Sequence, residues 1–366
     1  MKSFSEYKNS SNSRLINESA KTQYTMFPKT RKELEAMINE EIEKQGDEAD
    51  INHIDVSGIK DFHSIFEGSS FNGDISGWDV SNAENMHNMF AESEFDGDIS
   101  NWDVSNVTDM SYMFYDASNF NQDISGWNVS NATDMNHMFS NAYNFNQDIS
   151  DWDVSNVTDM SYMFEYARNF NYDISGWDVS NVANMEGMFA FSVFNHDISY
   201  WDVRKVTNMD RMFCGSIFNC DLKRWNTKNV KDMSQMFSGN RVFNRDISRW
   251  NVSNVENMNH MFSRCESFNQ DISKWDVSKV KDMAYMFQKT EFNQDISGWD
   301  VSNVERMSYM FGFNTKFNQD LSSWNVSNVN TMEGIFFGCT SFSYNVSSWS
   351  NWDASKIKSK LGTNTK

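Results

Sequence analysis

Phenylalanine recurs along the chain at a nearly constant spacing, and each recurrence starts a similar pattern of apolar and polar positions. The intervals are 24 or 25 residues long, and most follow F-N-x-D-I-S-x-W-[D/N]-V-S-N-V-x-x-M-x-x-M-F. The eleven intervals are bounded by Phe71, Phe95, Phe120, Phe145, Phe170, Phe194, Phe218, Phe243, Phe268, Phe292, Phe317 and Phe342. A period of about 20–50 residues is typical of solenoids, in which stacked coils bury together what no coil buries alone. The sequence therefore predicts a rod of stacked coils.

Each unit predicts a short strand followed by a short helical segment. The spacing I-x-x-W-x-V, seen in Ile99, Trp102 and Val104, matches the frame in which one strand per coil points apolar side chains inward. Residues 107–114 then place apolar side chains at offsets of 0, 3, 6 and 7, on one side of an α or 3₁₀ segment. The predicted fold class is an α/β solenoid of the leucine-rich-repeat type, with one parallel strand and one helical segment per coil.

The chain divides into four segments. Residues 1–27 are polar and predict a flexible segment, and residues 28–70 predict a capping helix and a degenerate coil. Residues 71–341 hold the eleven repeats, and residues 342–366 an incomplete coil and tail. The capping helix starts at Thr30-Arg31-Lys32-Glu33, which fits a capping box, and its apolar face extends to Gly46. It is expected to cover the open end of the first coil.

The repeats, for example FNQDISGWNVSNATDMNHMF, resemble those of the BspA-like leucine-rich-repeat surface proteins, which are also abundant among mycoplasma lipoproteins. The resemblance extends over about residues 27–355. It implies a solenoid without enzymatic activity or catalytic residues, used for adhesion or partner recognition at a surface. Chains of this family also occur in bacteriophage genomes, so the same resemblance implies either a cell-surface protein or a component of a virion.

Charge and composition exclude several classes of partner. The formal net charge is −20, which disfavours binding to nucleic acids or anionic membranes. No stretch is apolar enough for membrane insertion, and the polar opening residues show no signal peptide. The location is therefore left unknown, with the cell surface or a virion implied by the resemblance. Four cysteines form no disulfide framework.

One aspartate per unit forms a column that has two interpretations. The column comprises Asp74, Asp98, Asp123, Asp148, Asp173, Asp197, Asp221, Asp246, Asp271, Asp295 and Asp320. Asp side chains commonly accept hydrogen bonds from backbone amides at turns, and we expect this capping role. The alternative is a ladder of Ca²⁺ ions, although the unit lacks the paired glycines of calcium-binding repeats.

No other pattern predicts a metal site, a cofactor or a catalytic group. The methionines lie at helical spacing beside phenylalanine and are interpreted as core residues. The six histidines form no ligand pair, and Cys265 and Cys339 occupy a position held elsewhere by alanine. Neither a G-x-S-x-G elbow nor a glycine-rich phosphate loop is present. We therefore expect no enzymatic activity.

Charge is distributed unevenly along the rod. Residues 71–200 contain 21 acidic side chains and one basic, whereas residues 201–290 contain 10 acidic and 15 basic. The outward position before each tryptophan is mostly small or polar, but four successive coils place Tyr200, Arg224, Arg249 and Lys274 there. These residues are either a solvated face or a partner-binding stripe on the sheet face that contacts an acidic ligand.

The predicted function is non-catalytic recognition or adhesion, in which the rod binds another protein or a glycan at a cell or particle surface. A virion-associated structural or accessory protein is the first alternative. A calcium-binding repeat protein, which depends on the aspartate column, is an alternative of another class.

Overall fold

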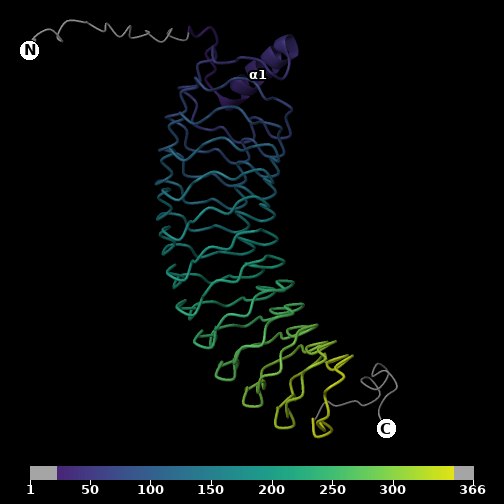
Figure 1. Ribbon diagram of the computed structural model, residues 1–366. Helices are drawn as coiled ribbons and strands as arrows, with labels where there is room; N and C mark the ends of the chain where they lie inside the picture. Colours follow the sequence, from purple (N-terminus) through teal and green to yellow (C-terminus); the bar gives the residue numbers. More distant parts are fainter. Residues whose placement is uncertain (1–22, 350–366) are drawn as a thin grey trace, which may run out of the picture.

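Each sequence repeat forms one coil, and the coils are stacked one after another along a single rod (Figure 1). The structure, a computed structural model, describes residues 23–349. The rod is nearly straight through its purple and teal coils and curves through its green and yellow coils (Figure 1). The predicted solenoid is confirmed. The predicted flexibility of residues 1–27 falls mostly outside the described residues, as does the tail from residue 350 onward.

The helix α1, Arg31–Gln45, covers the first end of the rod, as predicted. Thr30 is its N-cap and accepts a hydrogen bond from the Glu33 amide at 3.2 Å, and Gly46 ends it with a positive φ of 87°, which glycine adopts without a steric penalty. The side chains of Leu34 and Ile38 are buried in the rod's core. No helix among residues 23–349 combines the length and the apolar character needed to cross a bilayer.

Neighbouring coils pair in parallel, but at a different place from the predicted strand. The pairing consists of single bridges, most of them in one column, the residue before the first methionine of each unit, such as Asp109 with Asp134. The segment Ile99–Trp102 is instead a turn, closed by a hydrogen bond from the Trp102 amide to the Ile99 carbonyl at 3.1 Å. Ile99 and Trp102 are still buried, because a turn brings residues three apart to the same side. The strand assignment was wrong, and the inward-facing residues were right.

The predicted helical segment is also wrong, although its apolar side chains are buried as expected. Residues 110–117 form successive β-turns, in which the Met113 amide donates to the Met110 carbonyl and Tyr112 has φ 58°. A positive φ at the third residue together with this hydrogen bond defines a type II turn. Like a helix, such a turn places residues three apart on one side, which explains the misleading spacing.

The turns leave every second amide free to bond to the next coil. From the coil of Tyr112, four amides donate to carbonyls one repeat later, at distances of 2.8–3.0 Å: Met110 to Asp134, Tyr112 to Asn136, Phe114 to Met138 and Asp116 to Ser140. A helix would use these amides within the coil. The solenoid therefore favours turns, because stacking the coils requires hydrogen bonds between them.

Two columns of residues adopt left-handed backbone conformations as a result. The first column, with φ between 53° and 61°, contains Ser64, Asn88, Tyr112, His137, Tyr162, Gly187, Arg211, Gln235, His260, Tyr285, Tyr309 and Gly334. The second, with φ between 53° and 73°, contains Gly68, Glu92, Asp116, Asn141, Tyr166, Phe191, Gly215, Gly239, Arg264, Lys289, Phe313 and Gly338. Residues other than glycine and asparagine adopt this conformation at a cost of about 1–2 kcal/mol each. Stacking must offset this cost in every coil.

Aromatic ladders fill the interior. Trp152 is 3% exposed, its ring stacks 6.5 Å from Trp127, and its indole Nε1 donates to the Ile124 carbonyl at 3.2 Å. The two phenylalanines of a unit also stack, as Phe139 does with Phe145 at 3.9 Å. Stacked and offset rings provide stabilisation beyond their buried area. The aromatic residues therefore hold successive coils together along the whole rod.

Replacing Trp152 by alanine should lower the free energy of unfolding by about 3–5 kcal/mol, the range for large core truncations. The loss has two causes: a cavity between two coils, and the loss of one of the two hydrogen bonds that the Ile124 carbonyl accepts. Urea unfolding followed by circular dichroism measures the change. Asp151→Ala is the control, because the neighbouring Asp151 is exposed. An equal, small effect of both substitutions would contradict the packing described here.

Replacing Gly239 by alanine should cost about 1 kcal/mol through backbone strain alone. Gly239 has φ 73°, and an added Cβ would lie 3.6 Å from its nearest neighbour, the Gly215 Cα, so no clash contributes. The reciprocal change, Arg264→Gly at φ 59°, should not destabilise the protein and should be more stable than Arg264→Ala. Thermal unfolding of the three variants tests this order, and an Arg264→Ala variant more stable than Arg264→Gly would argue against left-handed turns.

Candidate partner-binding surface

The residues predicted as a stripe lie at one corner of the rod, on turns. In the coil of Tyr200, the Trp201 amide donates to the Ile198 carbonyl at 3.1 Å, and Asp197 accepts from the Ser199 amide at 2.9 Å. The residue before each tryptophan is thereby turned outward. We call the outward positions of Tyr200, Arg224, Arg249 and Lys274 the basic corner. The sheet-face location predicted for these residues is wrong, because these segments are turns.

The four side chains of the basic corner are exposed and occupy successive coils. Tyr200 is 72% exposed, and the Arg224 guanidinium lies over its ring at 4.4 Å from the centroid. This cation–π contact orients the arginine without neutralising its charge. Within residues 23–349, neither Arg249 nor Lys274 has an acidic partner within 4 Å. Hydrogen bonds from Ser248 and Ser273 and, in smaller part, the charges of Arg249 and Lys274 lower the pKa values of Asp246 and Asp271. The structure thus brings the predicted residues together as an exposed, positively charged column.

A shallow hollow adjoins Tyr200 and Arg224. Its volume is 270 Å³, and its lining includes Trp201, Asp202 and Arg204. Asp202 accepts hydrogen bonds from the Arg204 side chain, and this contact holds the pKa of the carboxyl below its usual range. Arg204 was missed from the sequence because it stands at a position that is serine in most units.

The aspartate column caps turns, as the first interpretation predicted. Asp98, for example, accepts a hydrogen bond from the Ser100 amide at 2.9 Å. Hydrogen bonds from the Ser100 side chain and amide lower the pKa of Asp98 and outweigh the opposing charges of Asp74 and Asp123. Among the described residues, no three His, Cys, Asp or Glu side chains converge in a way that holds a metal ion. The repeated carboxylates are therefore already engaged by the backbone.

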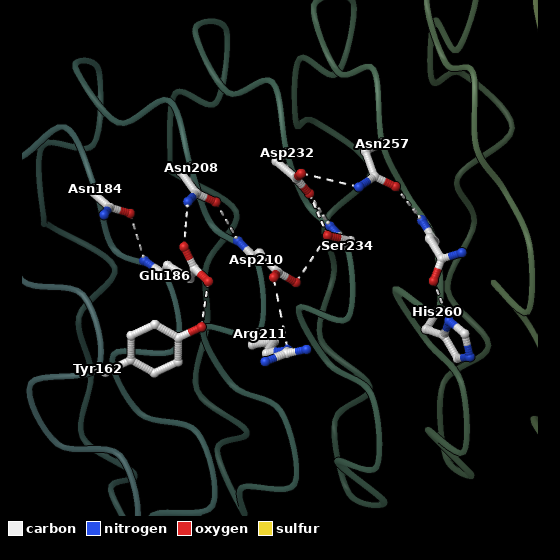
Figure 2. A network of polar contacts seen from close by, with 11 residues as sticks. Tyr162, Asn184, Glu186, Asn208, Asp210, Arg211, Asp232, Ser234, Asn257 and His260 are labelled. Carbon is white, nitrogen blue, oxygen red and sulfur yellow. Dashed lines mark hydrogen bonds and ion pairs between the residues drawn. The ribbon is translucent and has the colours of Figure 1, made fainter. Parts of the chain in front are cut away.

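A polar network on another face joins successive coils beside the left-handed turns (Figure 2). Glu186 accepts hydrogen bonds from the Tyr162 hydroxyl and from the Asn208 amide group. Asp210 accepts from the Ser234 hydroxyl at 2.9 Å and lies 3.8 Å from Arg211. Sequence reasoning missed this network. The available signal was Glu and Asp at a position that is mostly Ser, Asn or His elsewhere.

Three of the four cysteines, Cys214, Cys265 and Cys339, are buried, and His137 stacks between aromatic rings. Burial raises the pKa of Cys214 to about 11, so its thiol stays protonated at neutral pH. Cys265 and Cys339 are buried, as their alanine-like position predicted. His137 stacks between Tyr112 and Tyr162 at 4.3 and 4.6 Å, and burial lowers its pKa to about 4. These groups serve packing in the structure.

Asp210 should make the free energy of unfolding depend on pH, and replacing Asp210 by asparagine should remove this dependence. Burial raises the pKa of Asp210 to about 6, so its stabilising contribution is present below its unfolded pKa and is lost as the pH rises through about 6. Asp210→Asn should therefore gain about 2 kcal/mol relative to wild type between pH 4 and pH 8. Urea unfolding at both pH values measures the difference.

Asp98→Asn provides the control of opposite sign. In the wild type, hydrogen bonds from Ser100 lower the pKa of the Asp98 carboxyl. The stabilising contribution of this carboxylate is therefore present above its unfolded pKa and is lost as the pH falls through its folded pKa. This variant should therefore lose stability relative to wild type as the pH rises. The same pH trend in both variants would contradict the assigned shifts.

Comparison with known proteins gives one family match and weak structural likenesses. The family described as "Mycoplasma protein of unknown function, DUF285" matches residues 32–150, 123–217, 190–291 and 272–365. No curated protein matches the chain. A leucine-rich repeat protein from Eubacterium ventriosum is similar in structure, with 12% identity and a TM-score of 0.25 over 81% of this chain and 71% of that chain. A TLR13–ssRNA13 complex gives 10% identity and a TM-score of 0.24 over 80% of this chain and 55% of that chain.

Proposed function

The chain belongs to the DUF285 family, and we propose that it is a non-catalytic recognition rod, whose basic corner binds another protein or a glycan at a cell or particle surface. A rod of stacked coils offers a long, rigid surface on which residues of successive coils form continuous columns. Its outward columns can vary without disturbing the core.

The observation that supports this proposal is that inward positions are nearly constant from coil to coil, whereas an adjacent outward position varies. The tryptophan column is buried in every described coil, with Trp102, Trp201 and Trp299 each 4% exposed. The position just before it is glycine in several coils, yet it becomes Tyr200, Arg224, Arg249 and Lys274 in four successive coils. Packing does not require these exposed side chains, and aromatic and arginine residues are the types that most often anchor interfaces.

The surface location rests on the resemblance of the repeats to BspA-like surface proteins. A virion component remains the alternative location, and fractionation of cells and of any particles that they release distinguishes the two. The protonated Cys214 thiol and the uncharged, stacked His137 support a role without catalysis.

Substituting Arg224 and Arg249 together by alanine should weaken partner binding by about tenfold and reduce its dependence on salt. The ligand is first recovered with the immobilised whole chain, and binding isotherms at low and high salt then compare the variants. Lys228→Ala/Lys231→Ala is the matched control, since it removes two exposed charges from the same part of the rod, beside the next turn. Equal affinity of wild type and the Arg variant at both salt concentrations would remove the basic corner from the proposal.

A further inference from the structure

We propose that the basic corner is one edge of a wider face, which also comprises Phe191, Ile217, Val242 and Arg245 and which binds an extended acidic peptide segment that also carries apolar side chains. This inference rests on the proposed recognition function and names the class of its partner. Three sets of outward residues depart from the repeat pattern in the same few coils, and each contributes one part of this face.

The first part is an exposed apolar edge. Phe191 is 41% exposed, Ile217 51% and Val242 45%, and these residues belong to three successive coils, with Phe191 two positions earlier in its coil than Ile217 and Val242 are in theirs. Ile217 and Val242 stand just before the repeat phenylalanine, where other coils carry polar residues such as Asn119 and Glu291. Clustered exposed apolar groups on a soluble surface mark interaction sites more often than scattered ones do.

Phe191 is held rigidly at this edge. Its ring stacks on Tyr166 at 4.5 Å. It also lies so close to Gly215 that a Cβ there would come within 2.4 Å of the ring. Gly215 therefore makes room for the phenylalanine, which is 41% exposed but has little freedom to move. A preordered aromatic side chain binds a partner without a large loss of conformational entropy.

The second column connects the apolar edge to the basic corner. Five coils carry glutamine there, as at Gln270, whose side chain donates to the Asn244 carbonyl at 3.0 Å. Arg245 takes that position in the face and donates from Nε to the Asn219 carbonyl at 2.5 Å. One guanidinium nitrogen thus replaces the glutamine contact. Arg245 thereby adds positive charge between the two edges.

The dimensions of the face fit a peptide better than a folded domain. From Val242 to Arg249 the chain advances seven residues, which is at most about 23 Å when extended. Four coils at about 4.8 Å make the other dimension about 15–20 Å. The area is about 300–450 Å², well below the roughly 800 Å² per partner of a standard protein interface. An extended segment of about seven residues spans the wider dimension.

Charge and apolarity together select the acidic peptide. The exposed Arg249 and Lys274 favour carboxylates, and Ile217 and Val242 favour apolar side chains over the hydroxyl groups of a sugar. A second copy of the chain supplies aspartates, but its acidic coils carry Asn144 and Asn169 at the position of Ile217 and Val242. The charge of −20 disfavours nucleic acid. A peptide with apolar residues toward one end and Asp or Glu toward the other satisfies both edges.

The test uses a random heptapeptide library on beads, screened against the whole chain. The expected result is enrichment of sequences that combine Leu, Ile or Phe with two or more acidic residues. A selected peptide should lose at least fivefold in affinity against Ile217→Asn/Val242→Asn and against Arg224→Ala/Arg249→Ala. The first variant places asparagine where other coils already carry it, so the fold is kept. Lys228→Ala/Lys231→Ala should bind as wild type does.

A parallel arm measures binding of a heparin fragment as the anionic glycan probe. Heparin binding that depends on Arg224 and Arg249 but not on Ile217 and Val242, with no enriched acidic peptides, would overturn the peptide assignment and leave the recognition function standing. A peptide whose binding is unchanged by both face variants overturns the proposed face. If replacing Arg224 and Arg249 changes neither peptide binding nor heparin binding, the basic corner is removed from the proposed function as well.

Discussion

The hydrogen bonds between successive coils are the constraint on which the rest of this structure depends. Amides such as those of Tyr112 and Asp116 point along the rod to the next coil at 2.8 Å, and they do so because their residues adopt left-handed conformations. A buried amide without a partner costs more than the strain of such a conformation. Stacking and backbone strain therefore balance in every coil. Since each coil provides hydrogen-bond partners for the backbone of its neighbour, the stability of one coil depends on the presence of the next.

The fixed repeat has a direct consequence for the surface. Any outward position recurs in the next coil at nearly the same place, so a change of residue in a few coils creates a continuous patch. The basic corner and the apolar edge of Phe191, Ile217 and Val242 both arise in this way, without altering the buried ladders beside them. Different columns of residues thus serve recognition and folding, so the outward residues can change while the buried residues keep the rod intact.

Electrostatics follow the same separation. The aspartate column is engaged by backbone amides, as Asp98 is by Ser100, so its carboxylates stabilise turns and have lowered pKa values. Asp210 behaves in the opposite way, because it is buried among other acids and its pKa rises to about 6. The two carboxylates differ in their surroundings alone. The position of a carboxylate within the coil therefore decides whether its ionised form stabilises or destabilises the folded rod.

The sequence by itself determined the repeat, the inward residues, the capping helix and the exposed corner. These features follow from periodicity: a solenoid must bury the same column in each coil, and Trp102 and Met110 identify that column in any backbone conformation. Only the tertiary structure decided the turns, the single parallel bridges and the network around Asp210. Residues three apart share one side in a helix and in a turn alike, so spacing could not separate the two. What separated them was the demand for hydrogen bonds to the next coil, which lies about 25 residues away in sequence and leaves no local signal.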